Sequence, residues 1–169
     1  MKTIPVKTFY LQMHSPPERS VPPPIDDVEV RHVEQPTVEF YRFLYDTVGD
    51  ESVWLERRMI SRERLLAIIH DPRVEIYVPY VAGEPAGFGE LDRSVDNEVQ
   101  LMYFGLMPQF IGKGLGKYFL SWIVSKAWTY APQRVWLHTC ELDHKAALPL
   151  YRKAGFVLFD ERTVDHVAP

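Results

Sequence analysis

The chain has 169 residues, of which 46% are hydrophobic and 13% aromatic, enough for one domain with a sizeable core. Its formal net charge of −4 argues against broad binding to nucleic acids or anionic membranes, and its single cysteine, Cys140, excludes an internal disulfide and argues against a structural zinc site. With no apolar run of about 18 residues and no apolar signal core at the N-terminus, the sequence predicts a soluble, cytoplasmic protein that spans no membrane.

The first half of the chain alternates strand and helix signals around one proline-rich loop, residues 14–27. Five prolines lie between positions 16 and 24, so this loop is expected to be an extended surface crossing without a further role. Pro36 suits the first turn of a helix and Gly49 its end, and Phe43 would belong to the apolar stripe between them. In chain order, the predicted elements are strands at 8–13 and 28–33, the second at a sheet edge, a helix at 36–48, a loop or short half-exposed helix at 51–60, and a helix at 62–70 capped by Ser61.

The second half predicts a sheet with one parallel pair. Its expected elements are strands at 74–81 and 86–91 joined as a hairpin, a strand at 99–106, a helix from 113–116 to about Trp128, a strand at 134–140, a helix at 143–154, and a closing strand at 156–159 with the tail to 169 as one more candidate. A connecting helix should bring 134–140 parallel to 99–106, whereas the earlier strands should be antiparallel. Pro149 falls inside the last helix and is expected to weaken one turn.

The chain is organised around residues 98–124, which read as a buried strand, a glycine turn and a helix. The first amides of a helix have no partner within it, and the helix dipole places partial positive charge there. Gly112, Gly114 and Gly116 let an anion approach these amides, and two lysines add charge. The pattern predicts a phosphate site; the alternative is a turn whose glycines only allow close packing. Neither a P-loop nor a dinucleotide fingerprint fits the spacing.

Two motifs follow one another along this half of the chain. QFIGKG at 109–114 fits the pattern Q/R-x-x-G-x-G/A, and LYRKAGF at 150–156 fits L-Y-x-x-x-G-F. Together they resemble the GNAT superfamily of acetyl-CoA-dependent N-acetyltransferases, over about residues 74–159. The resemblance implies an α/β (α+β) fold, with a mixed, mostly antiparallel central sheet flanked by helices and splayed between its fourth and fifth strands, as a single domain over residues 1–169.

The resemblance implies acetyl-CoA (coenzyme A) as co-substrate and no metal. The backbone of Leu106 and Met107 would pair with the pantetheine arm, and the loop amides would hold the diphosphate. Two positions depart from the family pattern, because Ile111 stands where many members have arginine and His144 where many have asparagine. The predicted cofactor-binding residues are Leu106, Met107, Gln109, Phe110, Ile111, Gly112, Lys113, Gly114, Leu115, Gly116, Lys117 and His144.

The resemblance further implies direct attack of an amine on the thioester. Tyr151 aligns with the tyrosine that acts as acid toward the leaving thiolate; the alternative is a core tyrosine. An ammonium is no nucleophile, so a base must take its proton. Glu98 is the predicted base and Glu90 the runner-up, although each also reads as a solvated surface carboxylate. His138 could relay a proton, but reads better as a buried, hydrogen-bonded histidine.

The expected acceptor is a primary amine of a small molecule or peptide, with no nucleic-acid or membrane partner. The predicted substrate-binding residues are Tyr41, Trp54, Arg57 and Glu90, with Tyr45 and Arg58 as further candidates. The two arginines would suit an acceptor carrying a carboxylate or phosphate; otherwise they are solvated on a half-exposed helix. A catalytically weak acyl-CoA sensor or interaction module, and a plain nucleotide-binding α/β domain, stay open as other functions. The oligomeric state also stays open, with a homodimer as one option.

Overall fold

The computed structural model describes residues 1–50 and 52–168, so Glu51 of the predicted 51–60 segment and the last residue of the tail lie outside this part. The elements in chain order are β1 (Thr3–Met13), β2 (Val28–His32), α1 (Val38–Gly49), the 3-10 helix η1 (Glu56–Arg58), α2 (Arg62–Ile69), β3 (Val74–Val81), β4 (Glu84–Pro85), β5 (Gly87–Asp92), β6 (Glu98–Leu106), the 3-10 helix η2 (Pro108–Phe110), α3 (Leu115–Trp128), β7 (Arg134–Cys140), α4 (Ala147–Lys153) and β8 (Val157–Val167).

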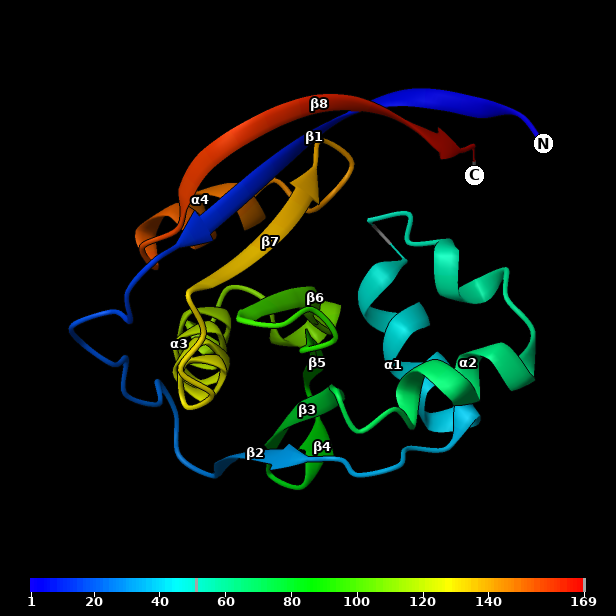
Figure 1. The fold of residues 1–169 in the computed structure, drawn as a ribbon. Helices are drawn as coiled ribbons and strands as arrows, with labels where there is room; N and C mark the ends of the chain where they lie inside the picture. Colours follow the sequence, from blue (N-terminus) through cyan, green and yellow to red (C-terminus); the bar gives the residue numbers. More distant parts are fainter. Residues whose placement is uncertain (51, 169) are drawn as a thin grey trace.

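The strands form one open sheet in the order β2-β3-β5-β6-β7-β1-β8, with β4 paired to β3. Neighbouring strands are antiparallel except β6 and β7, which pair in parallel only where residues 98–100 face residues 134–136. Beyond that short ladder the two strands diverge (Figure 1). The predicted fold class is therefore confirmed, because the splay falls between the fourth and fifth strands of the sheet order.

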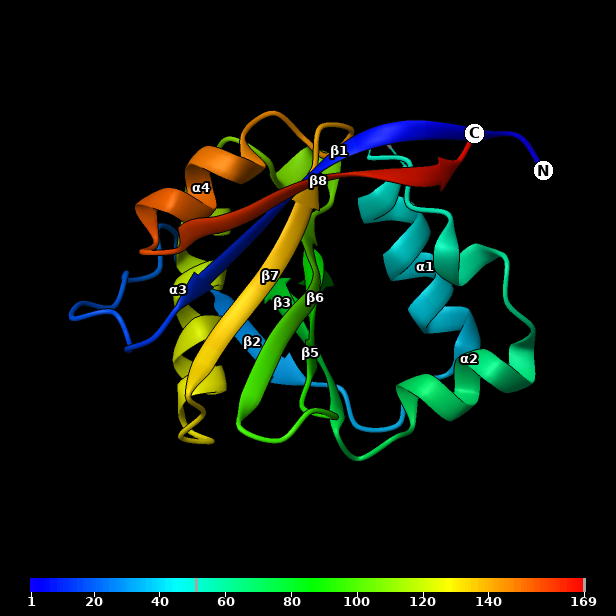
Figure 2. The ribbon, with the colours of Figure 1, turned by 45° about the horizontal axis from the view of Figure 1, so that its top comes forward.

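The helices cover both faces of the sheet. Leu44 and Leu65, on α1 and α2, belong to one buried cluster, and Phe119 and Tyr151, on α3 and α4, belong to another. Figure 2 shows these two pairs of helices on opposite sides of the strands. Within the described residues, no helix is long and apolar enough to cross a membrane.

Helix α1 directs its aromatic side chains differently from the prediction. The Thr37 hydroxyl caps the helix by accepting a hydrogen bond from the Phe40 amide at 3.1 Å. The residues buried along the helix include Tyr41, Leu44, Tyr45 and Val48. Their i, i+3, i+4, i+7 spacing defines one apolar face, and Phe43, expected on that face, is 48% exposed.

The N-terminal strand β1 lies inside the sheet, between β7 and β8. It begins at Thr3 rather than residue 8, because its first half pairs with β8 in a register that joins Thr3 to Val167. The closing strand is likewise a single strand of 11 residues rather than a short 156–159 segment. This pairing joins residues from opposite ends of the chain, and the local sequence carries no signal for it.

Helix α4 starts at Ala147, four residues later than predicted. Asp143 lies before this helix, and its carboxylate binds the last residues of β7. It accepts hydrogen bonds from the Thr139 hydroxyl at 2.6 Å and the Cys140 amide at 2.9 Å. Pro149 then lies in the first turn of the helix, where its missing N–H would have no partner anyway. The predicted weakening of a helical turn by Pro149 is therefore wrong.

Candidate active site

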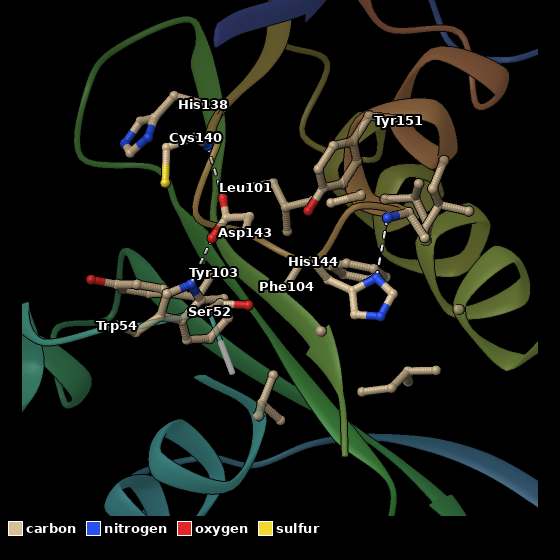
Figure 3. Close-up of a pocket in the computed structure, with 18 of the residues that line it drawn as sticks. Ser52, Trp54, Leu101, Tyr103, Phe104, His138, Cys140, Asp143, His144 and Tyr151 are labelled. Carbon is tan, nitrogen blue, oxygen red and sulfur yellow. Dashed lines mark hydrogen bonds between the residues drawn. The ribbon is translucent and has the colours of Figure 1, made fainter. Parts of the chain in front are cut away.

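A cavity of about 1000 Å³ lies at the opening between β6 and β7. Its walls come from η1, the open end of β6, the glycine turn before α3, the end of β7, and α4 (Figure 3). Residues 101–106 of β6 have no ladder partner on the β7 side among the described residues. A polar ligand can therefore bind along this free backbone edge.

Tyr151 presents an unpartnered hydroxyl to this cavity. Its side chain is only 7% exposed, and its ring packs edge-to-face on Phe104 and Phe156, with centroids 6.2 and 6.1 Å away. In Figure 3 the hydroxyl points between Leu101 and Asp143, and none of the described residues hydrogen-bonds to it. Burial, with a smaller contribution from the Asp143 charge, raises the pKa of Tyr151, so the phenol stays protonated and can donate.

The glycine turn offers a shorter run of free amides than expected. The amides of Phe110 and Ile111 donate to Met107 and Pro108 within η2, at 2.9 and 3.3 Å, so these two are not available to a ligand. From residue 112 to residue 117, no amide donates to a described residue; the first helical bond is made by the amide of residue 118. Six successive N–H groups thus stay open at the N-terminus of α3.

The turn needs glycine at two of its positions. Gly112 and Gly114 have φ of 85° and 80°, in the left-handed region that side chains rarely adopt. Gly114 directly precedes α3 and is its N-cap. Of the twelve predicted cofactor residues, those that line the cavity are Leu106, Ile111, Gly112, Gly114, Gly116, Lys117 and His144, and those that do not are Met107, Gln109, Phe110, Lys113 and Leu115.

The backbone N–H and C=O of Met107 are already hydrogen-bonded within the protein, so they are not free for the pantetheine arm as predicted. Its amide donates to the Ala86 carbonyl at 2.8 Å, its carbonyl accepts from the Phe110 amide, and its side chain is 2% exposed. Backbone groups alternate between the two edges of a strand, so Leu106 next to it turns its N–H and C=O toward the cavity. The free edge of β6 therefore ends at Leu106.

Asp143 and Trp54 join the two sides of the opening. The Trp54 indole N–H donates to the Asp143 carboxylate at 3.1 Å, and the residues come from opposite halves of the chain (Figure 3). The ring centroid of Trp54 also lies 5.5 Å from that of Tyr45 and 5.0 Å from that of Tyr103, and the three rings form an aromatic wall. The Tyr103 hydroxyl donates to Glu56 at 2.9 Å, which leaves a carboxylate at the cavity rim.

His138 is not the buried, hydrogen-bonded histidine that was expected. It alternates with the buried Leu137 and Thr139, and its exposed ring lines the cavity beside Cys140. No hydrogen bond to this ring is present among the described residues. The surrounding protein removes part of its hydration and so lowers the pKa of His138, while the nearby Glu56 and Asp143 charges oppose the effect. At neutral pH the imidazole is uncharged and can accept a proton.

Glu98 lies outside the cavity. It accepts a hydrogen bond from Arg134 at 2.9 Å at the closed end of β6. Eight residue steps along a strand place it about 26 Å from Leu106. The structure therefore gives the predicted base no access to a substrate at the open end.

Glu90, Tyr41 and Arg57 form a buried cluster behind the aromatic wall. The Glu90 carboxylate is fully buried, accepts from the Tyr41 hydroxyl at 2.7 Å, and pairs with Arg57 at 2.8 Å. Burial raises the pKa of Glu90, and both partners offset part of this shift. None of the three lines the main cavity, and Arg58 pairs with Asp46 at 2.7 Å. Both arginines are thus engaged by the protein's own carboxylates, and of the four predicted substrate-binding residues only Trp54 faces the cavity.

Replacing Glu90 by glutamine is expected to lower the free energy of unfolding by about 3 kcal/mol, because it leaves the Arg57 charge buried without a counterion. Asp46→Asn, which breaks the exposed pair with Arg58, serves as the matched control and should cost at most about 1 kcal/mol. Urea denaturation of both variants measures the difference. Equal losses in the two would contradict the structural role of the buried pair.

Among the described residues, no group of three or more His, Cys, Asp or Glu side chains is arranged to hold a metal ion.

A splayed sheet with a free strand edge and a helix N-terminus at its opening is the arrangement that the resemblance implied, and the comparisons with known proteins agree. A sequence model described as the Acetyltransferase (GNAT) family matches residues 30–156, so the chain belongs to this family of acetyltransferases. An uncharacterized N-acetyltransferase of Mycobacterium tuberculosis is 28% identical over 104 residues, which cover 62% of this chain and 66% of that protein. The chain therefore spans just under two thirds of the length of its curated relatives.

Solved structures show the same fold at low sequence identity. A GCN5-related N-acetyltransferase from Sphaerobacter thermophilus has a TM-score of 0.71 at 16% identity, over 96% of this chain and 52% of that chain. A GNAT family acetyltransferase from Elizabethkingia anophelis, solved with acetyl-CoA bound, has a TM-score of 0.62 at 18% identity, over 80% of each chain. An aminoglycoside acetyltransferase from an uncultured soil sample, solved with sisomicin, has a TM-score of 0.61 at 12% identity, over 77% of this chain and 88% of that one.

Proposed function

We propose that the protein transfers the acetyl group of acetyl-CoA to a primary amine by direct attack. The observation that carries this proposal is that one cavity is lined both by residues of the open-amide run, Gly112, Gly114, Gly116 and Lys117, and by Tyr151 with its unpartnered hydroxyl. The amides suit the diphosphate of coenzyme A, and the free edge of β6 up to Leu106 suits its pantetheine amides. A thioester threaded this way would lie near the phenol.

The reaction then uses two side chains of this chain. His138, uncharged at neutral pH, takes a proton from the ammonium group of the acceptor. The freed amine attacks the thioester carbonyl, the C–N bond forms, and the C–S bond breaks with its electron pair moving to sulfur. Tyr151 protonates the leaving sulfur, the nitrogen of the adduct gives its second proton to the resulting phenolate, and the proton held on His138 passes to solvent. The products are the acetylated amine, the coenzyme A thiol and one proton. The proposed base is therefore His138 instead of Glu98.

The acceptor side of the cavity suits a cationic amine. Its wall contains Trp54, Tyr103 and the Glu56 carboxylate, and aromatic faces and carboxylates both attract ammonium groups. The earlier expectation of an anionic acceptor depended on Arg57 and Arg58, which are both ion-paired. The aminoglycoside that a related fold binds is a polyamine, which agrees with a small-molecule amine as the acceptor class proposed here.

The test is release of coenzyme A thiol from acetyl-CoA in the presence of a panel of primary amines. Turnover that requires an amine supports the transferase. Tight binding of acetyl-CoA with no turnover on any amine of the panel would instead support the acyl-CoA sensor. Binding of ATP or NAD in preference to coenzyme A would contradict both.

A further inference from the structure

The proline-rich loop, residues 14–27, crosses the side of the molecule where α3 and α4 meet. It starts beside the end of α4, because a Cβ on Gly155 would lie 3.8 Å from the Met13 Cε. It is then anchored on α3, where the Val21 amide donates to the Ser121 hydroxyl at 2.9 Å. Figures 1 and 2 both show this segment, in blue, on the α3 and α4 side. We call residues 14–27 the strap.

The strap ends against the glycine turn. A Cβ on Gly114 would lie 3.2 Å from the Cβ of Pro24, so the two segments are in contact. Pro17, Arg19 and Val21 of the strap line the same cavity as the glycine turn. The expectation of a surface crossing without a role is therefore incomplete, since the strap forms one wall of the site.

The cavity is lined by several cations. They are Arg19 on the strap, Lys117 on α3, Lys145 before α4 and Lys153 on α4, and none of their side chains forms an ion pair or hydrogen bond with another described residue. The carboxylates that line the cavity are those of Glu56, Asp143 and Asp165, which come from other segments. Glu18, next to Arg19 in the sequence, is not among the lining residues. The lining therefore carries four lysine or arginine side chains and three carboxylates, although the whole chain is acidic.

Coenzyme A carries two separate anionic groups at its nucleotide end. The diphosphate suits the open amides before α3, but the 3′-phosphate sits on the ribose, several bonds away, where a separate cation can bind it. We propose that Arg19 on the strap binds this 3′-phosphate, with Lys153 on the α4 wall adding a second positive charge. This inference rests on the proposed function, since it takes coenzyme A as the ligand.

The backbone of the strap is restrained on both sides of Arg19. Five prolines between positions 16 and 24 restrict the backbone to extended conformations, so little conformational entropy is lost when a ligand binds. The bond between Val21 and Ser121 fixes the strap two residues from Arg19. A guanidinium group can bind a phosphate through two parallel hydrogen bonds, which a lysine cannot do.

Calorimetric titration with coenzyme A and with 3′-dephospho-coenzyme A tests the inference. The wild type is expected to bind coenzyme A at least about tenfold more tightly than the dephospho form. Arg19→Gln should remove most of this preference by weakening only the binding of coenzyme A. Arg64→Gln, on the exposed side of α2, is the matched control and should keep the preference.

Equal affinity of the wild type for the two compounds, or an equal loss for both in Arg19→Gln, would overturn the role of Arg19 and leave the proposed function standing. A wild type that binds neither compound would overturn both. Ser121→Ala tests the anchor separately, since it removes the hydroxyl that accepts from the Val21 amide. It should reduce the preference for the 3′-phosphate part of the way, with an unchanged unfolding midpoint; an unchanged preference would contradict the anchoring role.

Discussion

Tyr151→Phe is expected to lower kcat for amine acetylation by about 100-fold at neutral pH, because it removes the hydroxyl that we propose protonates the leaving thiolate. Coenzyme A binding should stay within about twofold, since the phenyl ring keeps its packing on Phe104 and Phe156. The fold should also be unaffected, because the lost hydroxyl has no hydrogen-bond partner among the described residues. Steady-state thiol release and calorimetry measure the two effects separately.

Tyr130→Phe is the matched control for this variant. The Tyr130 hydroxyl donates to Glu75 at 2.6 Å, and the residue lies outside the cavity. Loss of this hydroxyl should lower the free energy of unfolding and leave kcat unchanged. A Tyr151→Phe enzyme with wild-type kcat would show that solvent or another group protonates the thiolate, and that Tyr151 serves only in packing.

The features that sequence motifs predicted are those set by short stretches of chain. The predicted anion site before α3 depends on glycines that permit positive φ at Gly112 and Gly114, and on a helix start that leaves amides open. Tyr151 follows from a motif of seven residues at the end of α4. Local backbone chemistry is enough to place these residues, and all three line the cavity.

The features that were missed depend on contacts between distant segments. Arg57 looked available to a ligand until the fold placed Glu90, 33 residues away, against it. Glu98 is on the same strand as the cavity residues 101–106, but it lies at the end of β6 that is paired with β7. Asp143 could have been found, because a carboxylate just after a strand often binds the strand's last amides. Arg19 carries no local signal, because only the packing of the strap on α3 brings it to the cavity.

His138→Gln is expected to lower kcat by about 100-fold and to remove one limb of the pH profile. In the wild type, kcat/KM should rise with pH as the imidazole loses its proton, because only the neutral form accepts one. The pKa of His138 is lowered, so this limb should lie below the ordinary histidine value of about 6.5. A second limb at higher pH belongs to the ionisation of the acceptor amine and should persist in the variant.

His32→Gln, on the exposed edge strand β2, is the matched control and should keep both limbs. The carboxylates of Glu56 and Asp143 are the nearest alternatives, since both line the cavity and act on the charge of His138. If one of these carboxylates were the base, His138→Gln would leave the limb at lower pH in position. The profile of the variant therefore distinguishes a histidine base from a carboxylate one, independently of which amine the enzyme accepts.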